Sequence, residues 1–250
     1  MGGAGWSVEV SEERGVRYLH FGSDYVQGAM RISRPWALEL EYTRELMLPL
    51  LLRPGDWPAS VLQVGLGTAS VTKFLYRHRP HARITVVEIA PEVVDAARAF
   101  FHLPDDPKRV RIEIGEGHEY LIAKSKAFDF VIVDGFDDRG RAGMLDTLPF
   151  HLNARQRLAR NGLIATNLLT RRNNVDASVG RLRTAFDDRV LVIPPSDAGN
   201  TVAIAAVGAP IEASLADLRE AARRMKIATG LDLASALARL AKAHGETIAF

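Results

Sequence analysis

The chain has 250 residues, 47% of them hydrophobic and 25% charged, and its formal net charge is +2. This balance excludes the disordered and fibrous classes, and the length suits one large α/β domain with a small extension. Because the sequence contains no cysteine, disulfide frameworks and thiolate metal sites are excluded, and a reducing, cytoplasmic location is expected.

The first part of the chain predicts a small β unit over residues 1–34. Apolar and polar side chains alternate over 8–32, with turn residues between the runs, which indicates two or three antiparallel strands. So few short strands are not stable alone, and we expect the unit to pack on the predicted main domain, residues 35–250, or on a partner subunit. We place it beside a ligand crevice, with Tyr25 and Gln27 on one strand.

The rest of the chain alternates between predicted helices and strands. Helices are predicted from Pro35 to about Leu52 and near 69–78, 91–101, 117–124 and 146–159, and strands at 61–64, 83–88, 110–114, 128–133 and 163–166. This alternation predicts a parallel sheet with helices on both faces. Two final strands, 190–193 and 201–207, are joined by only seven residues, so they should pair antiparallel. That closing hairpin favours a methyltransferase-like, Rossmann-type sheet, followed by two amphipathic helices at 212–226 and 231–243.

The segment VLQVGLGTAS, residues 61–70, predicts a buried strand followed by a glycine turn and a helix. Gly65 and Gly67 let the backbone approach a ligand, and the first amides of the helix are unpaired donors. Glu88 ends a second apolar run 21 residues after Gly67, where a carboxylate is suited to accept hydrogen bonds from ribose hydroxyls. A nucleoside-like ligand is therefore expected.

Acidic residues follow two later strands. Asp134 should face the same crevice as the Gly65 turn, where a carboxylate can attract an amine and accept its proton. Taken alone, Asp137 and Asp138 are interpreted as solvated loop charges. Glu116 has two interpretations of equal weight, a ligand contact near adenine or an acid at a helix N-terminus. The seven histidines lack metal-binding spacing, so no metal site is expected, and no serine elbow or phosphate loop is found.

With these motifs together, residues 8–207 resemble the spermidine synthase (polyamine aminopropyltransferase) family, and most of all its short bacterial spermidine synthase-like branch. The shared motifs are YVQGAMR, the Tyr42-Thr43-Arg44 helix, the VxEIxPxVxxxAR pattern from Val86 to Arg98, and VDGFDD. The resemblance implies a small β unit on a methyltransferase-like domain, a homodimer, and decarboxylated S-adenosylmethionine as co-substrate. It implies that Gly65 and Gly67 border the nucleoside, Glu88 binds the ribose, Glu116 lies at the adenine side and Asp134 is the catalytic base, with Gln27 and Tyr42 at pocket positions.

The sequence departs from the family pattern at the glycine loop. Where the family has GGGDGG, with an aspartate near the aminopropyl tail, this chain has Thr68. The family motif D-S-x-D-P is here Asp134-Gly135-Phe136-Asp137-Asp138, which keeps both acids and leaves Asp137 as a substrate-binding candidate.

Three functions stay open at this point. The first is an aminopropyltransferase acting on a small amine, and the second is a methyltransferase using intact S-adenosylmethionine, which Thr68 favours because no carboxylate there would repel that of the ligand. The third is a non-catalytic nucleoside-binding protein on the same fold. The sequence has no run of 18 apolar residues and no signal-peptide pattern, so no membrane partner is expected. Its arginines are spread along the chain, which does not favour nucleic acid as a partner.

Overall fold

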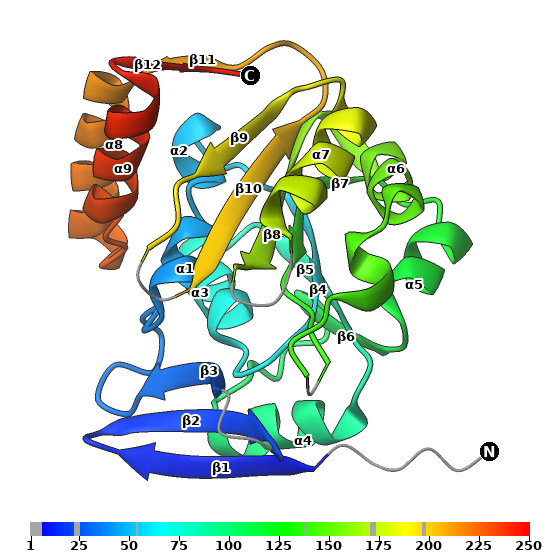
Figure 1. Ribbon diagram of the computed structural model, residues 1–250. Helices are drawn as coiled ribbons and strands as arrows, with labels where there is room; N and C mark the ends of the chain where they lie inside the picture. The colour runs from blue at the N-terminus through cyan, green and yellow to red at the C-terminus, as the bar shows by residue number, and fades with distance from the viewer. Residues whose placement is uncertain (1–6, 23–25, 54, 138, 171–173, 197–198) are drawn as a thin grey trace.

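A seven-stranded sheet runs through the centre of the computed structural model, which describes residues 7–22, 26–53, 55–137, 139–170, 174–196 and 199–250 (Figure 1). In spatial order its strands are β6 (Val110–Ile114), β5 (Arg83–Glu88), β4 (Ser60–Val64), β7 (Phe128–Val133), β8 (Leu158–Leu169), β10 (Asn200–Ala206) and β9 (Val190–Ile193). The first five are parallel, whereas β10 pairs antiparallel with both β8 and β9. The predicted methyltransferase-like sheet with its closing hairpin is confirmed.

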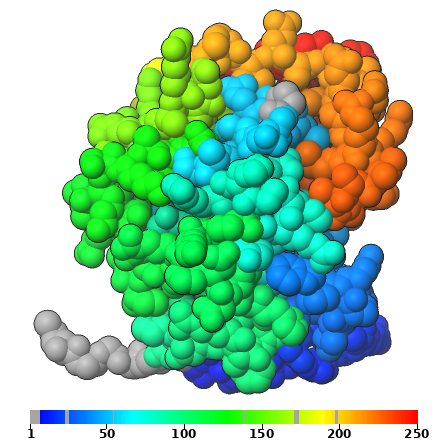
Figure 2. Space-filling view, turned by 180° about the vertical axis from the view of Figure 1, so that it is seen from behind, coloured from blue at the N-terminus to red at the C-terminus, as the bar shows by residue number. Residues whose placement is uncertain are grey.

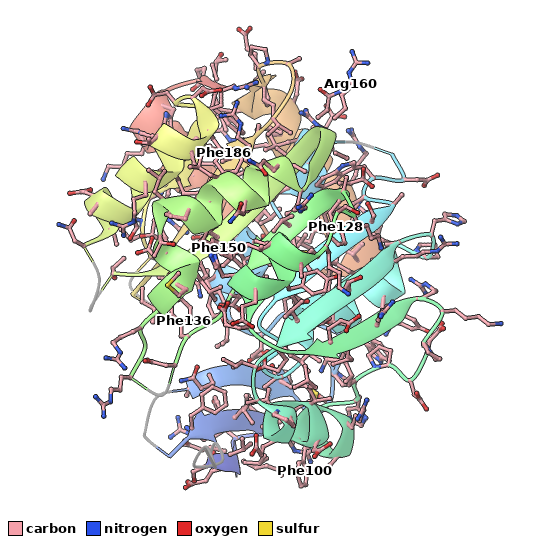
Figure 3. All side chains as sticks on the ribbon, turned by 90° about the vertical axis from the view of Figure 1, so that its right-hand side faces the viewer. Phe100, Phe128, Phe136, Phe150, Arg160 and Phe186 are labelled. Carbon is pink, nitrogen blue, oxygen red and sulfur yellow. The ribbon has the colours of Figure 1, made fainter. Side chains whose placement is uncertain are left out.

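Helices cover both faces of this sheet. One face packs against α1 (Glu41–Glu45), α2 (Pro49–Leu52), α3 (Ser70–His78), α4 (Pro91–Phe100), α8 (Leu215–Thr229) and α9 (Ala234–His244). The other packs against α5 (Gly117–Ala123), α6 (Leu148–Gln156) and α7 (Val175–Phe186), where Figure 3 shows Phe150 and Phe186. Because side chains alternate along a strand, Val61 of β4 enters the first layer and Leu62 the second. Both faces are buried, which explains the continuous apolar runs of the strands.

The predicted N-terminal unit is a three-stranded antiparallel sheet of β1 (Val8–Glu13), β2 (Val16–Phe21) and β3 (Val26–Arg31). It lies at the bottom of Figure 1, against α4 and the start of α3. A Cβ atom on Gly28 of β3 would lie 2.6 Å from Thr68 Cγ2, so the small sheet packs directly on the glycine turn. Tyr25, which the sequence placed on this strand, lies outside the described residues. The domain boundary at residues 34 and 35 stays a prediction.

The predicted single helix from Pro35 to Leu52 is wrong. The structure has only the short helices α1 and α2 there, joined by a tight turn in which Leu48 N donates to Glu45 O. Pro49 has no N–H to continue α1, and its ring would collide with the carbonyl four residues earlier, so it begins a new helix instead.

The chain end also differs from its prediction. Residues Glu212–Ser214 form β11 rather than the start of a helix, and they pair with β12 (Thr247–Ala249). Ser214 then caps α8, its hydroxyl accepting from Ala216 N at 3.2 Å. Across the ranges that the structure describes, no helix has the length and apolar character needed to cross a membrane.

A buried lysine joins the small sheet to the main domain. Lys73 of α3 is fully buried, and its Nζ donates to Phe101 O at 2.7 Å and lies 3.1 Å from Met30 Sδ of β3. Burial lowers the pKa of this amine to about 7. The folded chain therefore gives up this proton at a lower pH than the unfolded chain does.

This difference makes stability depend on pH. Because the unfolded chain binds more protons between pH 7 and about 10, the free energy of unfolding should rise with pH across that window, and Lys73→Met should remove the rise. Urea unfolding of wild type, Lys73→Met and the exposed control Lys242→Met at several pH values would measure it. Parallel curves for wild type and Lys73→Met would contradict this role of the amine.

Candidate active site

The glycine turn after β4 is fixed by close backbone contacts. Gly65 has φ +91°, and its N–H donates to Val87 O at 2.9 Å. A Cβ atom at this position would lie 2.1 Å from the carbonyl oxygen of Asp134, so only glycine fits. The buried Gln63 side chain supports the turn, since its Nε2 donates to Gly65 O at 2.7 Å and its Oε1 accepts from Thr72 Oγ1 at 2.8 Å. The carboxyl ends of β4, β5 and β7 therefore meet at one point.

A pocket of about 280 Å³ opens at this edge of the sheet. The predicted site residues that line it are Gln27, Gly65, Gly67, Glu88, Glu116, Asp134 and Asp137. Its apolar wall includes Val64, Val87, Ile89 and Leu145, the last from the loop after β7. Figure 3 shows Phe136 on that loop, between the main domain and the small sheet. The structure therefore brings the strand ends, β3 and this loop together around one space.

Glu88 lies at the base of this pocket with its carboxylate held by backbone donors. Oε2 accepts from Leu66 N at 2.8 Å and Oε1 from Ala90 N at 3.0 Å. Burial raises the pKa of Glu88, and these hydrogen bonds oppose that rise. Each carboxylate oxygen can accept a further hydrogen bond, so the group is oriented to receive two hydroxyls from a ligand.

Asp134, directly after β7, has only neutral hydrogen-bonding partners. Asn167 Nδ2 donates to its Oδ1 at 2.8 Å, and the Tyr42 hydroxyl donates to the same carboxylate. Burial raises the pKa of Asp134 to about 6, and the two hydrogen bonds limit the rise. Among the described residues no cation contributes to this shift. The site therefore holds a carboxylate that carries a charge at pH 7 and that a cationic ligand would stabilise.

The other two acids of the pocket are bonded to residues close to them in the chain. Glu116 is the N-cap of α5, where its Oε2 accepts from Glu119 N at 3.0 Å, so the helix-cap interpretation is confirmed while the side chain also lines the pocket. Asp137 accepts from Arg141 N at 2.8 Å and pairs with the Arg141 guanidinium. Burial raises the pKa of Asp137, but these bonds outweigh burial and leave it lowered. Asp138 lies outside the described residues.

Tyr42 and Thr68 line a second, smaller cavity of about 20 Å³ that shares Asp134 and Leu66 with the larger pocket. Thr68 is buried, and its hydroxyl lies 2.9 Å from Ser70 Oγ. Thr68 is thus placed behind the turn, near Asp134, rather than on the wall of the larger pocket.

The sequence reasoning missed two groups of the site. Asn167 of β8 supports Asp134, and its own Oδ1 accepts from Asn200 Nδ2 of β10 at 3.0 Å. The sequence signal was an asparagine inside an apolar strand, but only the β7–β8 pairing shows its partner. Arg141 lines the pocket as the partner of Asp137, and its position four residues after that acid was the available signal.

A family model described as the spermine/spermidine synthase domain matches residues 40–174, more than half of the chain. The chain belongs to this family. It is 34% identical over 233 residues to a polyamine aminopropyltransferase of Neisseria meningitidis, covering 93% of this chain and 88% of that protein. A polyamine aminopropyltransferase of Chromobacterium violaceum is 32% identical over 240 residues, with 96% and 91% covered. The resemblance noted in the sequence is confirmed.

Solved structures share the fold of this family member. A probable spermidine synthase from Corynebacterium glutamicum has a TM-score of 0.66 at 19% identity, covering 80% of this chain and 76% of that one. Human methyltransferase-like protein 13 in complex with SAH has a TM-score of 0.69 at 20% identity, with 76% and 93% covered. At these identities the likeness confirms the methyltransferase-like fold and does not separate the two activities.

Replacing Gly65 by alanine should break the site, because the new methyl group would overlap the Asp134 carbonyl. Gly55 is a matched control, since it has φ +81° but no described atom within 4 Å of an added Cβ. Gly55→Ala should cost about 1–2 kcal/mol of unfolding free energy for the left-handed backbone alone. Gly65→Ala should cost about 2 kcal/mol more from the steric clash.

Urea unfolding would measure both changes. Calorimetric titration with methylthioadenosine should show binding by the control and none by Gly65→Ala. Equal stability of the two variants would disprove the steric constraint.

Proposed function

We propose that the chain is a polyamine aminopropyltransferase that transfers an aminopropyl group from decarboxylated S-adenosylmethionine to an amine. Family membership and the names of its relatives support this activity. The observation that carries the proposal is Asp134, a carboxylate with neutral partners that faces both cavities of the site. Such a group suits a reaction in which a cationic amine must be held and then deprotonated.

In this proposal the larger pocket binds the nucleoside. Gly65 and Gly67 provide bare backbone beside it, Glu88 accepts from the ribose hydroxyls and Glu116 lies at the adenine side. The apolar wall of Val64, Val87 and Leu145 suits a purine ring. We place Tyr42 and Asp137 on the amine side, and Gln27 and Thr68 on the co-substrate, with Thr68 close to the aminopropyl tail.

The chemistry then follows from the position of Asp134. Once deprotonated, the amine nitrogen attacks the aminopropyl carbon bonded to the sulfonium, that carbon–sulfur bond breaks, and its electron pair stays on sulfur in methylthioadenosine. The proton lost by the amine goes to Asp134. A pKa of about 6 makes this carboxylate a better proton acceptor than an ordinary aspartate while keeping it charged at neutral pH.

Methyl transfer from intact S-adenosylmethionine is the second candidate, supported by Thr68 in place of an aspartate. A non-catalytic nucleoside-binding role is the third candidate function. The raised pKa of Asp134 disfavours this role, because groups with shifted pKa values concentrate at catalytic sites. We further propose a homodimer and a cytoplasmic location, the first from the family resemblance and the second from the absence of cysteine.

Asp134→Asn should lower turnover by about 10²–10⁴, the share of a general base, and leave nucleoside binding intact. In the wild type, kcat/KM should fall as the pH is lowered through about 6, because protonation removes the base. Assays with decarboxylated S-adenosylmethionine and a panel of aliphatic diamines would measure both, with the exposed Asp95→Asn as control. Wild-type turnover by Asp134→Asn would contradict the assignment.

Thr68 offers a test of co-substrate choice. An aspartate there would attract the tail ammonium of the decarboxylated ligand and repel the carboxylate of the intact one. Thr68→Asp should therefore increase the preference for decarboxylated over intact S-adenosylmethionine. The neutral Thr68→Asn, of matched size, should not. Calorimetric titration of wild type and both variants with the two ligands would show this. If wild type already strongly prefers the decarboxylated ligand, then Thr68 does not weaken selection.

A further inference from the structure

Two side chains of α9, Arg239 and Ser235, contact α1, and the Ser235 hydroxyl donates to Glu41 Oε1 at 3.0 Å. Arg239 of α9 donates from Nη1 to Glu41 Oε1 at 3.0 Å and from Nη2 to Glu45 Oε1, so a single guanidinium holds both acids of α1. Its Nε donates to Pro194 O, just after β9, at 2.8 Å. Figure 1 shows α9 beside β9, and in Figure 2, seen from behind, the orange C-terminal segment lies on the right.

Tyr42 follows the first of these two acids in α1. Glu41 and Glu45 are four residues apart, so they lie on one face of α1, while the Tyr42 hydroxyl points to Asp134. The helix has only five residues, its N-cap Leu40 makes no side-chain cap, and Pro49 prevents its extension. A helix this short is not stable by itself, and contacts from elsewhere must fix it.

We propose that Arg239 is a positioning residue for the reaction: by clamping Glu41 and Glu45, it sets α1 so that the Tyr42 hydroxyl reaches Asp134. The inference rests on the proposed function for its catalytic meaning, but the placement of Tyr42 does not depend on turnover. It assigns the α8–α9 pair a part in the site, although neither helix lines the pocket.

The ion pairs of Arg239 with Glu41 and Glu45 lie in a largely buried, charged environment. The Glu45 side chain is 2% exposed and that of Arg239 20% exposed, so the carboxylate is removed from water and the guanidinium partly so. Burial raises the pKa of Glu45 to about 7, and Arg239 opposes the rise. Arg44 and Glu41 from α1 and Asp232 before α9 complete the charged surroundings. Loss of the guanidinium would leave Glu45 buried without its partner. Either α1 would have to move, or the Glu45 carboxylate would have to take up a proton.

The test follows the ionisation of Asp134 directly. Carboxyl-¹³C NMR titration of aspartate-labelled protein reports its pKa, with the signal assigned by its loss in Asp134→Asn. The groups facing Asp134 are Tyr42 from α1, Asn167 from β8 and the nearby charge of Glu88 from β5. Tyr42→Phe should raise the pKa of Asp134 by about one unit, because a hydrogen bond that favours the charged form is lost.

Arg239→Gln should raise the same pKa by a similar amount, and the double variant should show no further rise. Arg224→Gln is the matched control, since it removes an exposed pair with Glu220 on α8. Its Asp134 titration should match wild type. Tyr42→Phe and Arg239→Gln should each also lower kcat about tenfold. Their affinity for methylthioadenosine should stay within twofold of wild type, because neither substituted residue lines the larger pocket.

Glu45→Gln provides the same test in a milder form if Arg239→Gln does not fold. An unchanged Asp134 titration in the folded Arg239 or Glu45 variant, or additive shifts in the double variant, would overturn the proposal. The failure of wild type to transfer an aminopropyl group would count against the proposed function alone, since the titration needs no turnover.

Discussion

The close approach of Gly65 to the carbonyl of Asp134 is the constraint on which the site depends. At this point the ends of β4 and β7 are nearer than any side chain on residue 65 would allow, and the turn is further held by Gln63 and by the hydrogen bond from Gly65 N to Val87 O. Because the backbone fits so closely, the glycine turn, Glu88 and Asp134 share one edge of the sheet. The small N-terminal sheet closes this edge from the other side, packing Gly28 against Thr68.

The four acids of the pocket differ in the groups that hydrogen-bond to them or pair with their charge. Backbone donors orient Glu88, Arg141 neutralises Asp137, and Glu116 caps a helix. Asp134 has an amide and a phenol as partners, and burial raises its pKa to about 6. This difference supports our proposal that Asp134 holds the amine and that Glu88 accepts from the hydroxyls of a nucleoside.

Much of this arrangement was predictable because it follows from local rules. Strand ends, the glycine turn and the acids at 88 and 134 have sequence signals, and their meeting at one edge follows from a parallel sheet. Contacts between distant segments had no such signal. Neither the Asn167 support of Asp134 nor the clamp of Arg239 on α1 can be read before the pairing of strands and the packing of α9 are known. Pro49 was a visible signal, yet the apolar pattern around it suggested one helix where the chain forms two.

Aminopropyl transfer is the central claim, and its products test it most directly. The purified chain should be incubated with an aliphatic diamine and either decarboxylated or intact S-adenosylmethionine, and the products quantified by mass spectrometry. We expect methylthioadenosine and the aminopropylated amine in equal amounts from the decarboxylated ligand, and no transfer from the intact one. Methylated amine with S-adenosylhomocysteine from the intact ligand, or no product from either, would contradict the account.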